Sequence, residues 1–191
     1  MSKTTLKGGA LLAPIPPVMV SCSDGEHDNI ITIAWCGMLA TNPPTTYISV
    51  RPTRHSYEMI KKSGEFVINL TSEELTREAD YCGIFTGAKV DKFEKCKLTK
   101  EAATQVACPM IGESPLSIEC RVKDIIPMGT HDIFMADILA VNVRDDILDE
   151  SGRICMDKAH LTAYAHGEYF AMGKSLGKFG FSATKKKKKR K

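Results

Sequence analysis

The sequence lacks the short motifs that mark several large enzyme classes. It contains no GxGxxG, Walker A, HExxH or GxSxG pattern, so Rossmann, P-loop, zincin and hydrolase functions lose their main support. No run approaches the ~20 apolar residues that span a bilayer. The first apolar segment, residues 10–15, is short and interrupted by proline, which argues against a signal peptide. We therefore expect a cytoplasmic protein that does not enter a membrane.

Paired cysteine motifs are also missing. The chain has seven cysteines, an odd number, and no two of them form a CxxC pair. Structural zinc sites usually contain such a pair, whereas scattered thiols in a reducing compartment behave as small buried hydrophobes. Cys36, which follows the single tryptophan, is the one candidate for a redox-active thiol, and burial without chemistry is its more common role. We expect no metal site.

Basic residues are scarce outside the C-terminal end, although the net charge is +3. The last seven residues, KKKKKRK, are all basic; removing them from the 26 Lys and Arg leaves 19 against 23 Asp and Glu, or −4 for residues 1–184. Polybasic runs bind phosphate backbones without reading sequence. We therefore expect a disordered basic tail over residues 181–191 and no specific nucleic-acid recognition.

Apolar alternation and turn signals predict a chain built mainly of β-strands. A length of 191 residues suits one domain, and we place it at residues 14–180, after an N-terminal arm over residues 1–13. The expected strands cover residues 18–23, 29–36, 45–51, 65–70, 114–124 and 131–143. The pattern indicates an antiparallel β-barrel with short peripheral helices, a mainly β (α+β) fold.

Two short helices are expected beside these strands. One runs from about Thr53 to Lys62 and ends at Gly64. The other follows a capping box formed by Thr71 and Glu74 and stops at Gly83.

The junction between the strand at 45–51 and the helix after it is a candidate anion site. A helix start exposes unpaired N–H groups and carries partial positive charge. Arg51 and Arg54 add full charges there, and Ser56 adds a hydroxyl. These groups match a phosphate, although a capped surface helix with two solvated arginines has the same pattern.

Three weaker signals accompany the junction. Asn29, Thr32 and Trp35 share an isoleucine-rich strand and either frame a flat aromatic ligand or belong to an ordinary barrel strand. Lys92 follows a glycine-containing stretch and would place a point charge on a phosphate. His131 precedes a long strand and either meets a ligand edge or is a turn residue.

Taken in order, these stretches resemble the flavin reductase-like family, which has an FMN-binding split barrel and includes flavoredoxin. The stretches that carry the resemblance are NIITIAW (29–35), Pro43-Pro44, ISVRPTRHSYEMI (48–60), GEFVINL (64–70), DYCGIFTG (80–87), DKF (91–93) and GTHDIFMADI (129–138). The resemblance implies a six-stranded Greek-key split barrel that forms a homodimer, with flavin mononucleotide (FMN) near the subunit interface.

The resemblance also implies roles for individual residues. Asn29, Ile30 and Thr32 would line the isoalloxazine ring, with Trp35 beside it. The phosphate side would be held by Ser49, Val50, Arg51, Arg54, Ser56, Lys92 and Phe93. His131 would lie near the redox edge, where a nicotinamide approaches, and Tyr164 and Tyr169 would close over the ring.

Two functions follow from the resemblance. One is a flavin oxidoreductase that moves electrons from NAD(P)H through FMN to an acceptor. The other is an electron carrier of the flavoredoxin type, which holds FMN and exchanges electrons with a protein partner without turning over NAD(P)H itself. The sequence does not separate them.

Overall fold

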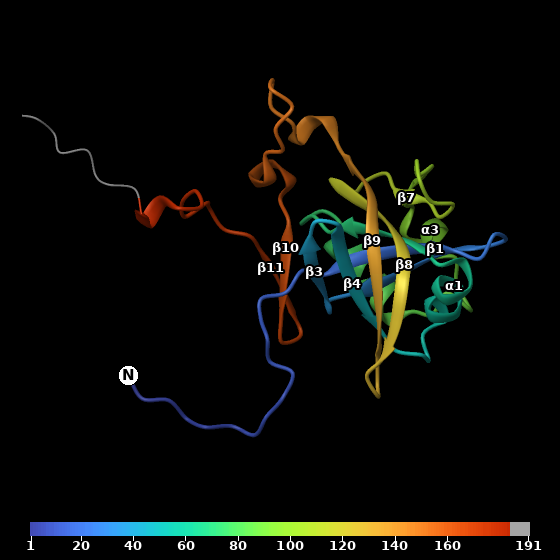
Figure 1. The fold of residues 1–191 in the computed structure, drawn as a ribbon, viewed down its shortest axis with the longest axis horizontal. Coiled ribbons are helices and arrows are strands. Elements are labelled where there is room, and N and C mark those ends of the chain that lie inside the picture. Colours follow the sequence, from blue (N-terminus) through green and yellow to red (C-terminus); the bar gives the residue numbers. More distant parts are fainter. Residues whose placement is uncertain (184–191) are drawn as a thin grey trace, which may run out of the picture.

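The computed structural model describes residues 1–183, which form an antiparallel β-barrel with short helices around it (Figure 1). One seven-stranded sheet runs in the order β2-β1-β5-β8-β9-β4-β3. Its strands are β1 (Val18–Ser23), β2 (Asp28–Ile33), β3 (Cys36–Thr41), β4 (Pro44–Val50), β5 (Glu65–Leu70), β8 (Leu116–Pro127) and β9 (Asp132–Val143). The antiparallel, mainly β class predicted from the sequence is confirmed.

The sheet curls until its two ends approach each other. Residues of β2 contact residues of β4, although these strands stand near opposite ends of the sheet order. The chain runs from β2 through Trp35 directly into β3, and the backbone N–H of Ser49 on β4 donates to the carbonyl of Trp35 at 2.9 Å. Several of the residues predicted to bind a ligand come from β2, the turn after it and the end of β4.

The main sheet has one strand more than the six predicted. We expected one strand over residues 29–36, but the chain bends at Ala34 and Trp35, and β3 starts at Cys36. β3 pairs with β4 through a hairpin at Asn42-Pro43, where the sequence indicated only a break. The strand was missed because it is an edge strand whose side chains are largely exposed, including Met38 and Leu39, so it shows no clean alternation.

Among residues 1–183 there are three α-helices, which lie beside the sheet, and three 3-10 turns. The helices are α1 (His55–Ser63), α2 (Thr76–Ile84) and α3 (Lys92–Cys96), and the 3-10 turns are η1 (Asp145–Ile147), η2 (Met156–Ala159) and η3 (Phe181–Ala183). Gly64 ends α1 with a positive φ of 70°, as the sequence predicted. No helix among residues 1–183 combines the length and the apolar character that crossing a membrane requires.

The predicted capping box at α2 is wrong. α2 begins at Thr76 after Leu75, with no side-chain cap, and Gly83 lies inside the helix. Residues 71 and 72 are held instead by the start of β10 and the residue before it, because Thr162 donates its N–H to the carbonyl of Thr71 and Ser72 bridges to Leu161. A long-range contact that the local pattern could not show thus replaces the capping box.

Two further hairpins complete the fold. β6 (Lys100–Glu101) pairs with β7 (Met110–Ile111), and β10 (Thr162–Ala165) pairs with β11 (Glu168–Ala171). The N-terminal arm runs away from the barrel and passes the β10–β11 hairpin before entering β1 (Figure 1). The link is a bridge between Ile15 and Tyr164, whose backbone groups exchange hydrogen bonds of 3.0 and 2.8 Å.

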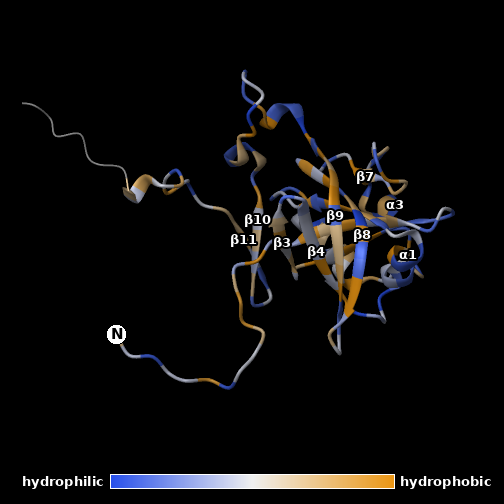
Figure 2. Cartoon of the chain, in the orientation of Figure 1, coloured by the Kyte–Doolittle hydropathy of each residue, from blue (hydrophilic) through white to orange (hydrophobic). Residues whose placement is uncertain are grey.

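Apolar side chains form the barrel core and a second cluster under the helices. The barrel core includes Val20, Ile48, Ile60, Phe66 and Phe134. In Figure 2 hydrophobic colour lies along the sheet strands, and it also appears on the extended N-terminal arm and after β11. η3 occupies the first three residues of the predicted tail, and residues 184–191 lie outside the described part of the chain.

Candidate functional site

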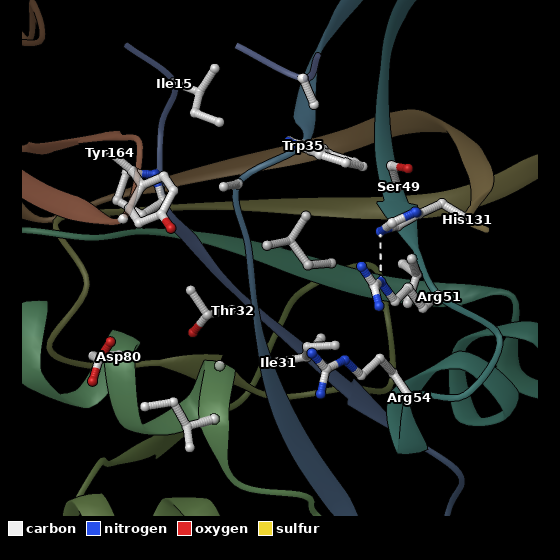
Figure 3. Close-up of a pocket in the computed structure, with 18 of the residues that line it drawn as sticks. Ile15, Ile31, Thr32, Trp35, Ser49, Arg51, Arg54, Asp80, His131 and Tyr164 are labelled. Carbon is white, nitrogen blue, oxygen red and sulfur yellow. Dashed lines mark hydrogen bonds between the residues drawn. The ribbon is translucent and has the colours of Figure 1, made fainter. Parts of the chain in front are cut away.

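A cleft of about 650 Å³ opens where β2, the end of β4, α2 and the β10–β11 hairpin meet. Figure 3 shows the side chains that point into it. Of the residues predicted from the sequence, the cleft is lined by Thr32, Trp35, Ser49, Val50, Arg51, Arg54, His131, Tyr164 and Tyr169. The fold therefore brings together residues from four separate stretches of the chain.

One end of the cleft is cationic. Nε of Arg51 donates to Nε2 of His131 at 3.3 Å, and the His131 ring lies 4.6 Å from the Trp35 ring, tilted by 44°. Burial lowers the pKa of His131, and the charges of Arg51 and Arg54 lower it further. His131 is therefore held as the neutral imidazole, which is the form that accepts the bond from Arg51.

The two arginines have no carboxylate partner. Among the described residues, no Asp or Glu oxygen lies within 4 Å of either guanidinium. α1 starts directly after Arg54 and no side chain caps it; the N–H of Tyr57 donates to the carbonyl of Arg54, which leaves the N–H groups of His55 and Ser56 for another acceptor. Two exposed cations and an uncapped helix start form a site for an anionic group.

A smaller pocket of about 80 Å³ adjoins this end and shares Ile31, Arg54 and Gly83 with the main cleft. Asn29 donates through Nδ2 to Oγ of the buried Ser56 at 2.8 Å. A Cβ placed on Gly87 would lie only 2.2 Å from Oδ1 of Asn29. This position therefore requires glycine.

Lys92 reaches the small pocket from α3. The side chain is buried, and Nζ donates to the carbonyls of Ile30 at 2.6 Å and Cys82 at 2.8 Å. Burial lowers the pKa of Lys92. An ammonium group has three donors, so one remains for another acceptor.

The opposite wall of the cleft carries hydroxyl and carboxylate groups. The hydroxyl of Tyr169 donates to Oδ1 of Asp80 at 3.2 Å, and Oγ1 of Thr32 donates to the carbonyl of Ala79. The rings of Tyr164 and Tyr169 meet edge to face at 5.3 Å. Burial, with Asp80 as the next cause, raises the pKa of Tyr169 to about 12.

Some predictions and the structure diverge at this site. Ile30 and Phe93 are buried in the second core cluster and line neither pocket, although the main-chain oxygen of Ile30 anchors Lys92. Cys36 packs against the barrel core, and burial raises its pKa to about 11. Sequence reasoning missed Asp80 because nothing in a surface helix pattern distinguishes one carboxylate from its neighbours.

Comparison with known proteins gives three findings. The model of the flavin reductase like domain matches residues 12–173. Flavoredoxin of Desulfovibrio vulgaris (Miyazaki F) superposes with a TM-score of 0.90 and 31% identity, over 96% of this chain and all of that one. FMN reductase (NADH) RutF 2 of Rhizobium rhizogenes is 25% identical over 107 residues, which is 54% of this chain and 58% of that protein.

Proposed function

Because this chain belongs to the flavin reductase-like domain family, we propose that its cleft holds FMN and that the protein moves electrons from NAD(P)H through FMN to an acceptor. The main support is that Arg51 and Arg54, which have no carboxylate partner within residues 1–183, lie at one end of a cleft large enough for a planar ring. A flavin oxidoreductase needs both features in one place.

The residues of the cleft fit FMN in shape and charge. FMN joins a flat, largely apolar ring to a doubly charged phosphate. Ile31, Trp35 and Tyr164 give the cleft apolar and aromatic surface for the ring. Arg51, Arg54 and the first turn of α1 give it a cationic end for the phosphate. Ser56, the second residue of α1, lies in the adjoining small pocket.

Each side chain then has a defined task. The arginines and the α1 N–H groups hold the phosphate, and Trp35 with Tyr164 covers ring surface. The free donor of Lys92 holds negative charge at the inner end of the site. FMN supplies the chemistry of hydride acceptance when bound, so no side chain has to act as a nucleophile.

His131 is positioned to guide the donor. It lies beside Trp35 and is fixed by Arg51 and Thr130, which contact its two ring nitrogens. The ring face is left for a ligand, and a flat face suits a nicotinamide ring. The relative named as an NADH-dependent FMN reductase supports this donor class.

A flavoredoxin-type electron carrier is the second candidate. It is favoured by the match to flavoredoxin over nearly the whole chain. A carrier binds FMN tightly and consumes NAD(P)H slowly by itself, whereas a reductase oxidises NAD(P)H rapidly when flavin is present.

One purified sample tests both candidates. We expect a yellow protein, or quenching of FMN fluorescence on titration, followed by bleaching of the flavin on anaerobic addition of NADH or NADPH. Bleaching only with a reduced protein partner would favour the carrier. A colourless protein that quenches no flavin fluorescence would exclude both.

We also propose that the protein works as a homodimer in the cytoplasm. The edge strand β3 exposes Met38 and Leu39, and the arm exposes Leu12. Leu176 and Phe179 are exposed after β11. Clusters of exposed apolar groups usually mark an interaction surface. Light scattering coupled to gel filtration should give twice the 21.0 kDa chain mass, and a monomer that still binds FMN would refute the dimer alone.

A further inference from the structure

Asp80 is the only acidic side chain among the described residues that lines the cleft. It projects from α2 on the side of the cleft opposite Arg51 and Arg54 (Figure 3). The cleft is therefore electrically asymmetric, with two cations at one end and one carboxylate at the other.

One neighbouring side chain holds the Asp80 carboxylate in place. Its only hydrogen bond that the structure records comes from the hydroxyl of Tyr169 at 3.2 Å. No Lys or Arg nitrogen of the described chain lies within 4 Å of it. On its other side the bond from Thr32 to the carbonyl of Ala79 ties this turn of α2 to β2. Asp80 is thus fixed beside the strand that forms the floor of the cleft.

A fixed negative charge affects the two redox states of a flavin unequally. Reduction by two electrons and one proton turns a neutral ring into an anionic one, while the phosphate is unchanged. Like charges close to each other disfavour the charged form, and the interaction strengthens when a ligand displaces water from between them. A carboxylate in this cleft therefore opposes reduction more than it opposes binding of the oxidised ring.

We propose that Asp80 lowers the reduction potential of FMN bound in the cleft and so makes the reduced protein a stronger electron donor. The proposal rests on the proposed function, because it requires FMN in this cleft. Asp80 acts on the bound flavin through its charge, and it is not one of the groups that bind the phosphate.

The test is a spectroelectrochemical titration of the full-length, FMN-loaded protein. Asp80→Asn keeps the size of the side chain and removes its charge, so reduced FMN should gain affinity relative to oxidised FMN by about tenfold. For a two-electron couple a tenfold change corresponds to about 30 mV, and the shift should be positive. The shift should also shrink in high salt, because Asp80 is exposed to solvent.

Two control variants separate charge from structure. Tyr169→Phe removes the hydrogen bond to Asp80 but leaves the carboxylate, so its potential should not rise. Asp157→Asn removes an exposed carboxylate that lines no pocket, and its potential should match the wild type.

The outcomes are distinguishable. A positive shift in Asp80→Asn alone supports the proposal. Equal potentials in the wild type and Asp80→Asn overturn it. The same positive shift in Asp80→Asn and in Tyr169→Phe also overturns it, because Asp80 would then act only by connecting the β10–β11 hairpin to α2. If the wild type binds no FMN at all, the proposed function fails first.

Discussion

Replacing Arg54 should weaken FMN far more than riboflavin, because only FMN carries the phosphate. Arg54 lies at the start of α1, is exposed, and has no carboxylate partner among the described residues. Its guanidinium is therefore free to bind an anionic ligand, and Arg54→Ala removes a charge without leaving a carboxylate unpaired.

The size of the effect follows from the contact it removes. A hydrogen bond to a charged group contributes about 1.5–3 kcal/mol, and 1.4 kcal/mol is a tenfold change in affinity. Because Arg54 is exposed, solvent screens the interaction, and the lower end of this range applies. We expect FMN affinity to fall about tenfold and riboflavin affinity to stay near the wild-type value.

Flavin fluorescence quenching measures both affinities on the same sample. Arg77→Ala is a matched control, since Arg77 is an exposed arginine on α2 that lines no pocket. Raising the salt concentration should narrow the gap between wild type and Arg54→Ala for FMN. Equal losses for FMN and riboflavin would place the phosphate elsewhere and refute the reasoning.

Three further predictions follow from other contacts. Gly87→Ala should displace the Asn29 side chain, because the new Cβ would lie 2.2 Å from its Oδ1; FMN should bind more weakly, and unchanged binding would argue against the small pocket. Burial raises the pKa of Glu119, but hydrogen bonds from Thr104, Asn142 and Gln105 outweigh it and lower the pKa overall. Glu119 therefore stabilises the fold at pH values above its unfolded-state pKa, and this stabilisation is lost as the pH falls through its lowered folded-state pKa. Thermal melts at decreasing pH should show a smaller loss of stability in Glu119→Gln than in the wild type, and an equal loss would contradict this. Deleting residues 185–191 should leave FMN titrations unchanged, and loss of flavin would show that the tail takes part.

The candidate site was predictable where local sequence carried the chemistry. A strand followed by Arg51, Arg54 and a helix start indicates an anion site from spacing alone, and the structure places both arginines on one cleft. The apolar run at 29–35 likewise predicted a strand; β2 ends at Ile33, and Trp35 lies in the bend after it, on the cleft and against His131. These features could be predicted because each of them depends on residues that are close together in the chain.

Other features depended on contacts that no local pattern contains. Phe93 follows Lys92 directly, yet one packs in the core while the other reaches the small pocket, because a helix turns neighbouring side chains to different faces. Strand β3 and the β10–β11 hairpin were missed, and the hairpin supplies Tyr164 and Tyr169 to the wall. Its place is set by Ile15, which is almost 150 residues away along the chain.

The amino-acid sequence by itself determined six strands of the main sheet, the start of α1 and the cationic groups, since each depends on the order of nearby residues. The tertiary structure alone decided that Asp80 faces those cations across one cleft. Asp80 and Arg54 are separated in the chain by α1, β5 and the first turn of α2, and only the curling of the sheet brings their elements to the same opening. Charged residues that are far apart in the sequence act on the same ligand only when the fold brings them to one site.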